Sequence, residues 1–98
     1  NTDIFFGTEF SDARLHPKEM ILGIQVEGKF KAYKESALPI GETADIFLDR
    51  QVIIKKDEAG EIRMLLGDAR APLPYIRVFW FSWLAAHPET ELFIGRTN

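Results

Sequence analysis

Residues 72–93 read PLPYIRVFWFSWLAAHPETELF and contain both tryptophans of the chain. The longest apolar run, residues 78–86, lies inside this stretch and is broken only by Ser82. A chain of 98 residues has to bury such a segment, because removing apolar area from water is the main driving force of folding. We therefore expect the rest of the chain to cover it.

Two prolines bound a predicted helix in this stretch. Pro74 has the φ of a first helical position, and Pro88 disfavours helical geometry at His87. The helix between them would have about 12 residues, close to the mean for globular proteins. At about 100° per residue, its apolar side chains gather on one face. That face consists of Ile76, Phe79, Trp80, Trp83 and Leu84. A strand is the alternative, since Val, Phe and Trp favour strands, but the length of the run and its Leu-Ala-Ala ending favour the helix.

The opposite face of the predicted helix is not polar either. It would carry Tyr75, Val78 and Phe81 beside Arg77. A helix that is apolar nearly all round is usually buried on both sides. Tyr75, Val78 and Phe81 are therefore predicted to contact either a curled sheet or another molecule.

Alternating residues predict a hairpin over residues 20–33, with a two-residue turn in which Gly28 supplies the positive φ. The inward residues would be Leu22, Ile24, Val26, Phe30 and Ala32. The outward residues would be Lys29, Lys31 and Tyr33. One helical turn is expected at residues 35–38, before Pro39 and Gly41.

A second alternating region predicts a meander over residues 44–66, with a loop at residues 57–60. Its inward residues would be Ala44, Ile46, Leu48, Val52, Ile54, Ile62, Met64 and Leu66. Asp45 and Asp49 would lie outward on a solvent-exposed face. Short strands are also expected at residues 91–94 and, as an added edge, at residues 4–6. Together these elements predict an α+β fold: a small antiparallel β-meander or partly open barrel of five to six strands, packed on one long C-terminal helix.

Composition indicates a single domain, residues 1–98, of an ordinary soluble kind: 46% hydrophobic and 28% charged residues. The net charge is −3, from 12 basic and 15 acidic residues without a block of one sign, which disfavours nucleic acid binding. The apolar run has roughly half of the 20 residues that a membrane-spanning helix needs, so this run is not expected to cross a membrane. There is no cysteine, so disulfide and thiol chemistry are excluded within this segment. Because the chain begins at Asn1 without a methionine, we interpret it as a fragment of a longer protein.

Several motifs carry a family resemblance. They are LHPKE at residues 15–19, LGI at 22–24, KAY at 31–33, APLP at 71–74, FWFSW at 79–83 and HPETEL at 87–92. Over residues 15–92 the chain resembles a bacterial family catalogued only as a domain of unknown function, although Lys34 stands where that family usually has proline. Longer members carry a Cys-Pro-x-Cys motif that has no counterpart here. The resemblance implies that this chain is the carboxy-terminal part of a larger protein, that thiol or metal chemistry belongs to the missing part, and that the location is extracytoplasmic. It implies no activity.

The two histidines, His16 and His87, each precede a proline and would be metal ligands only with further acids such as Glu19 or Glu89. A metal site needs at least three converging ligands, and two histidines 71 positions apart give no such spacing. His87 is instead expected to interact with the C-terminal end of the helix dipole. Ser82 has no nucleophile elbow around it. The sequence therefore predicts no catalytic residue, no metal and no cofactor in this segment.

Arg70 and Arg77 flank the predicted start of the helix, where backbone N–H groups and the helix dipole attract anions. A small carboxylate or phosphate would bind there, unless both arginines pair with nearby acids such as Asp68. Two functions remain open. The leading hypothesis is a non-catalytic accessory or interaction domain that contacts the rest of its own protein, or a second copy, through Tyr75, Val78 and Phe81. The alternative is a small-anion or small-ligand module at Arg70 and Arg77.

Overall fold

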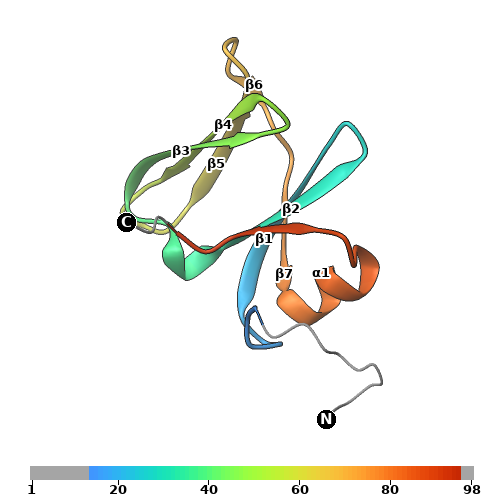
Figure 1. The fold of residues 1–98 in the computed structure, drawn as a ribbon. Coiled ribbons are helices and arrows are strands. Elements are labelled where there is room, and N and C mark those ends of the chain that lie inside the picture. The colour runs from blue at the N-terminus through green and yellow to red at the C-terminus, as the bar shows by residue number, and fades with distance from the viewer. Residues whose placement is uncertain (1–13, 96–98) are drawn as a thin grey trace.

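The computed structural model describes residues 14–95, which form two four-stranded sheets and one short α-helix (Figure 1). The first sheet has the order β7-β1-β2-β8 and consists of β1 (Met20–Val26), β2 (Lys29–Lys34), β7 (Ile76–Phe79) and β8 (Glu91–Phe93). The second sheet has the order β3-β4-β5-β6 and consists of β3 (Gly41–Phe47), β4 (Arg50–Lys56), β5 (Ile62–Leu66) and β6 (Ala71–Pro72). A 3-10 turn, η1 (Glu35–Ala37), connects β2 to β3, and α1 (Trp80–Ala86) follows β7. All described strand pairs are antiparallel except β2 with β8.

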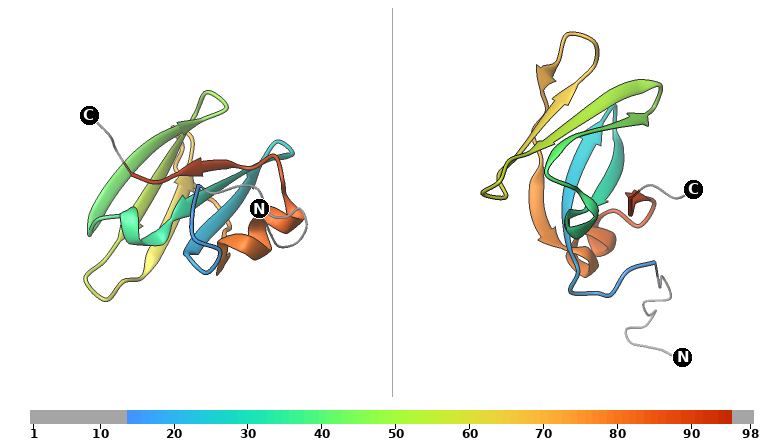
Figure 2. Two further views of the ribbon diagram at one scale, coloured as in Figure 1. Left: turned by 60° about the horizontal axis from the view of Figure 1, so that its bottom comes forward. Right: turned by 90° about the vertical axis from the view of Figure 1, so that its left-hand side faces the viewer.

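The first sheet is the middle layer of three (Figure 2). One of its faces packs on the second sheet, and we call this the inter-sheet core. Its buried members are Leu22, Ile24, Val26, Tyr33, Leu38, Phe47, Val52, Ile54, Met64 and Leu73. The other face packs on α1, and we call this the helix core. Its buried members are Ile21, Ala32, Trp80, Trp83 and Leu84.

The predicted hairpin is confirmed. β1 and β2 pair from Ile21 with Lys34 to Val26 with Lys29, across the turn Glu27-Gly28. Both turn residues have positive φ, 52° and 79°, as a type I′ turn requires. The turn at residues 35–38 appears as η1, and the last strand appears as β8, which runs parallel to β2. The predicted strand at residues 4–6 lies outside the described residues.

The predicted α+β fold with one long C-terminal helix is wrong. Residues Ile76–Phe79 form strand β7, and α1 covers only the seven residues Trp80–Ala86. Ile76–Phe79 are β-branched and aromatic apart from one arginine, and they satisfy the backbone of β1 by pairing with it. The start of α1 is fixed from outside, because the N–H groups of Trp80 and Phe81 donate to the carbonyls of Glu19 and Pro17 at 2.8 and 2.9 Å.

Consequently, the predicted core face of the helix is only partly correct. Trp80, Trp83 and Leu84 are buried, as expected. Ile76 and Phe79 are 52% and 41% exposed, because they lie on the edge strand β7 rather than on the helix.

The prediction of a solvent-exposed face on the sheet is also wrong in two places. Lys31 and Tyr33 were expected outward, but both are buried because the first sheet is covered on both faces. On β3 the facing is reversed: Thr43 and Phe47 are buried, whereas Ile46 is 62% exposed. The inward positions on β4 and β5 are confirmed for Val52, Ile54 and Met64.

Within residues 14–95, no helix has the length and apolarity that a membrane crossing requires.

Candidate functional site

The two arginines predicted to bind an anion lie on different sheets. Arg77 is on β7 and contacts Glu35 at three points, with its Nη2 3.0 Å from Oε1 and its Nε 3.1 Å from each carboxylate oxygen. The Glu35 carboxylate raises the pKa of Arg77 above its ordinary value. Arg70 lies in the turn between β5 and β6, where its Nη2 is 3.2 Å from Oε2 of Glu42.

Neither arginine is at the start of α1. The first N–H groups of that helix already donate to backbone carbonyls. A cavity of about 400 Å³ beside Arg77 is also lined by Glu35 and Glu61, so two carboxylates face one guanidinium there. This charge balance opposes anion binding, and the arginines pair with Glu35 and Glu42 rather than with Asp68.

The three residues predicted to form an interface do not share a face. Tyr75 packs against the inter-sheet core and its hydroxyl donates to the carbonyl of Ile62 at 2.7 Å. Val78 packs against the helix core. Phe81 is 39% exposed, and its ring stacks on that of Phe79, with centroids 6.0 Å apart and planes at 17°.

The exposed apolar residues of this region therefore follow the strand edge instead of a helix face. Among residues 14–95, β7 is the outermost strand of the first sheet and pairs only with β1. Ile76 and Phe79 of β7 are large exposed side chains, and so is Phe81 of α1, whose ring stacks on that of Phe79. We call these three residues, together with the free backbone edge of β7, the β7 edge.

A polar network that sequence analysis missed joins the two sheets. Lys31 of β2 donates to Oδ2 of Asp45 on β3 at 2.7 Å, and the Tyr33 hydroxyl donates to the same oxygen at 2.7 Å. The rings of Tyr33, Phe47 and Phe93 surround the Lys31 ammonium at 5.4 to 5.9 Å. Burial raises the pKa of Tyr33 well above its ordinary value, and the hydrogen bond to Asp45 raises it further, so this hydroxyl stays protonated as a donor.

The signal for this network was weak in the sequence. Side chains on β3 alternate between its two faces: Thr43, Asp45 and Phe47 lie on one, and Ala44 and Ile46 on the other. Either set could face the core, and the set that looks more apolar in the sequence is the wrong choice. The network is closed and nearly buried, and we assign it to holding β2 against β3 rather than to chemistry.

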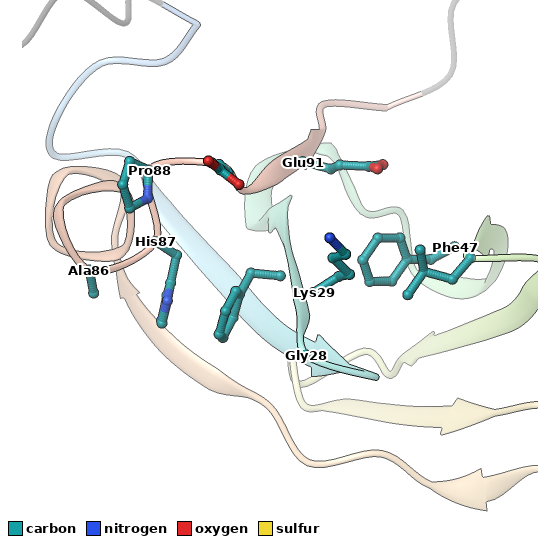
Figure 3. Close-up of a pocket in the computed structure, with 10 residues that line it drawn as sticks. Gly28, Lys29, Phe47, Ala86, His87, Pro88 and Glu91 are labelled. Atoms are coloured by element: carbon teal, nitrogen blue, oxygen red, sulfur yellow. The ribbon is translucent and has the colours of Figure 1, made fainter.

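A pocket of about 450 Å³ lies where the tip of the β1–β2 hairpin meets the β3–β4 turn and the segment after α1 (Figure 3). We call it the hairpin-tip pocket. It is lined by Gly28, Lys29, Phe30, Phe47, Leu48, Ala86, His87, Pro88, Glu89 and Glu91. The ring of His87 stacks on Phe30 with centroids 3.7 Å apart and planes at 15°, and Trp83 meets His87 edge-on at 4.3 Å. These residues come from three separate segments, so no local motif could have revealed the pocket.

The two histidines have separate structural roles. His87 is the C-cap of α1, where its backbone N–H donates to the carbonyl of Trp83 at 2.8 Å. His16 accepts a hydrogen bond from the backbone of Lys18 at 3.0 Å, through Nδ1. Across residues 14–95, no three side chains of His, Cys, Asp or Glu gather as metal ligands.

Comparisons of the chain with models of protein families, with curated proteins and with solved structures gave no match.

Proposed function

We propose that this domain is a non-catalytic interaction module that binds its partner along the β7 edge. The observation that carries the proposal is the coincidence of an open strand edge with large exposed apolar side chains. The edge of a sheet offers unpaired N–H and C=O groups to any extended chain that reaches it. Exposed apolar side chains beside such an edge mark an interaction surface.

The other sheet edges are less suited to this role. β6 has two residues and contains Pro72, which cannot donate to a neighbouring strand. β8 has three residues, and β3, which carries the exposed Ile46, also carries two acidic residues, Glu42 and Asp45, and charges on an edge strand disfavour pairing. β7 contains one charged residue, Arg77, which forms an ion pair with Glu35. Strand β7 therefore has neither a proline nor an unpaired charge that would protect it from pairing.

The proposed partner is a second copy of the chain. Antiparallel pairing of β7 with its own copy obeys two-fold symmetry, so the same surface serves both molecules. It would join two four-stranded sheets into one, with Ile76 beside the partner strand on one face of the sheet and Phe79 beside it on the other.

Sedimentation velocity over a wide concentration range tests this proposal. We expect a concentration-dependent dimer whose dissociation constant rises at least about tenfold in the Ile76→Lys, Phe79→Lys variant, a loss of about 1.4 kcal/mol. The control is Ile46→Lys, since Ile46 is more exposed than Ile76 or Phe79 but lies on β3; it should leave the dimer unchanged. A chain that is monomeric at every concentration, or an Ile46→Lys variant that dissociates as readily, would contradict the proposal.

A further inference from the structure

We propose that the hairpin-tip pocket binds a small zwitterion with an apolar side chain, the chemistry of a free apolar amino acid. The inference rests on the walls of the pocket, on the charges at its rim and on a strained turn beside it. It is independent of the proposed function, because neither Ile76 nor Phe79 lines this pocket.

The walls of the pocket suit a flat or apolar group. Phe30 and His87 form one wall as a stacked pair, and Phe47 lies across the space from His87 in Figure 3. Ligand pockets are typically about 300–1,000 Å³ with apolar and aromatic walls. At about 450 Å³, this one holds a molecule of amino-acid size with room for its polar groups.

The rim of the pocket carries both signs of charge. Lys29, Glu89 and Glu91 line it, and within the described chain no ion pair joins the lysine to either carboxylate. Their convergence follows from the parallel pairing of β2 and β8, in which Lys31 lies beside Glu91. Lys29 lies two residues before Lys31 on β2, and Glu89 lies in the turn that precedes β8. Figure 3 shows the Lys29 amino group pointing into the space between His87 and Phe47.

These charges select among ligand classes. The nearby Lys31 is already neutralised by Asp45, so it adds no free charge. Within residues 14–95, the Lys29 ammonium has no ion-pair partner and would bind the carboxylate of a ligand, whereas Glu89 and Glu91, equally unpaired there, would bind its ammonium. A ligand with a single charge would use only part of the rim, whereas a zwitterion uses both signs.

The turn beside the pocket is strained at an apolar residue. Leu48 and Asp49 connect β3 to β4 with φ values of 55° and 61°. A left-handed conformation costs roughly 1–2 kcal/mol for an ordinary residue, and Asn or Gly avoids much of that cost. Strained backbone that persists is often found at functional sites. Here the strained residue places an apolar side chain on the lining of the pocket, where it would contact the ligand.

The test is titration calorimetry with phenylalanine and three analogues: phenethylamine, which lacks the carboxylate; 3-phenylpropanoate, which lacks the amine; and N-acetylphenylalanine amide, which lacks both charges. We expect phenylalanine to bind at least about tenfold more tightly than any analogue, since each lost charge contact is worth roughly a factor of ten. Thermal melts of each variant establish that it is folded.

Matched variants assign the two charges of the ligand. Lys29→Gln should reduce the affinity for phenylalanine to that for phenethylamine, and leave phenethylamine binding unchanged. The double variant Glu89→Gln, Glu91→Gln should reduce the affinity for phenylalanine to that for 3-phenylpropanoate, and leave the binding of 3-phenylpropanoate unchanged. Lys55→Gln, an exposed lysine outside this pocket, should change nothing. Leu48→Asn should raise the melting temperature and weaken phenylalanine binding.

Three results would overturn the inference. They are the absence of binding by phenylalanine, an analogue that binds as tightly as phenylalanine, and a Lys29→Gln variant that weakens all four compounds equally. Tight binding of phenethylamine alone would show a cation site instead.

Discussion

The two faces of the first sheet are both buried but are held in different ways. The face toward the second sheet buries ten core residues around a polar network of Lys31, Tyr33 and Asp45. The face toward α1 buries five residues, two of them tryptophans. The first interface contains a buried ion pair, whereas the second depends mainly on the fit of two indole rings, with one buried hydrogen bond from Trp83 to Thr90.

The packing of α1 against the first sheet requires a glycine at position 23. A Cβ placed there would lie 2.4 Å from the ring of Trp83, well inside van der Waals contact. The absence of a side chain on β1 therefore creates the space into which the indole packs. One sheet therefore uses a different mechanism of stabilisation on each of its two faces, and the following substitutions separate the two.

The largest effect is expected for Asp45→Ala. Removing this carboxylate leaves the ammonium of Lys31 and the hydroxyl of Tyr33 nearly buried without an acceptor. Breaking a buried pair from one side typically costs about 3–5 kcal/mol, and the 15% exposure of Asp45 places the expected loss near the lower end. Urea denaturation gives the free energy of unfolding.

Glu58→Ala provides the control, because Glu58 is an exposed acid of the β4–β5 loop, and such substitutions usually stay within about 0.5 kcal/mol. If Asp45→Ala is no more destabilising than this control, the inter-sheet interface is held by its apolar residues alone.

A smaller loss is expected for Gly23→Ala on the opposite face. Inserting a methyl group against a packed ring typically costs about 1–3 kcal/mol, and we expect about 2 kcal/mol here, because the added Cβ would lie 2.4 Å from the ring of Trp83 and that ring has to shift. The double variant Gly23→Ala, Trp83→Leu should lose less than the sum of its single losses, because the smaller side chain relieves the overlap. Strict additivity in the same denaturation measurement would show that Trp83 does not set the requirement for glycine.

The sequence was informative where a local rule acts alone. The β1–β2 hairpin was predictable because its turn residues, Glu27 and Gly28, and its alternation agree. The tryptophans and Leu84 were correctly placed in the core because their size leaves few alternatives.

Prediction failed where tertiary pairing decides between two acceptable local structures. Residues 76–79 fit the helical period, but β1 had an edge to fill, and pairing with it made them a strand. Asp45 and Ile46 fit either face of β3, and only the buried Lys31 on another sheet determines which one faces inward. Most of the hairpin-tip pocket was invisible for the same reason, since its lining is assembled from three distant segments.

The smallest effect is the expected difference in unfolding free energy between Trp→Phe substitutions at the two tryptophans of the helix core. The Nε1 of Trp83 donates to Oγ1 of Thr90 at 2.8 Å, whereas the Nε1 of Trp80 is buried and has no partner among the described residues. Both indoles are almost fully buried, so Trp→Phe removes similar apolar area at each site. Only Trp83→Phe also removes a satisfied hydrogen bond and leaves a buried hydroxyl without its donor, which costs about 1–2 kcal/mol more.

Trp83→Phe is therefore expected to be the more destabilising of the two by about that amount, in the same denaturation measurement. Thr90→Val should cost about 1–2 kcal/mol in the natural background, because the Trp83 N–H loses its acceptor, and much less in the Trp83→Phe background. Equal losses for the two tryptophans would mean that shape alone stabilises the helix core. A Thr90→Val loss that persists without the indole would instead attribute the role of Thr90 to its own contact with the carbonyl of Glu91, which its hydroxyl reaches at 2.9 Å.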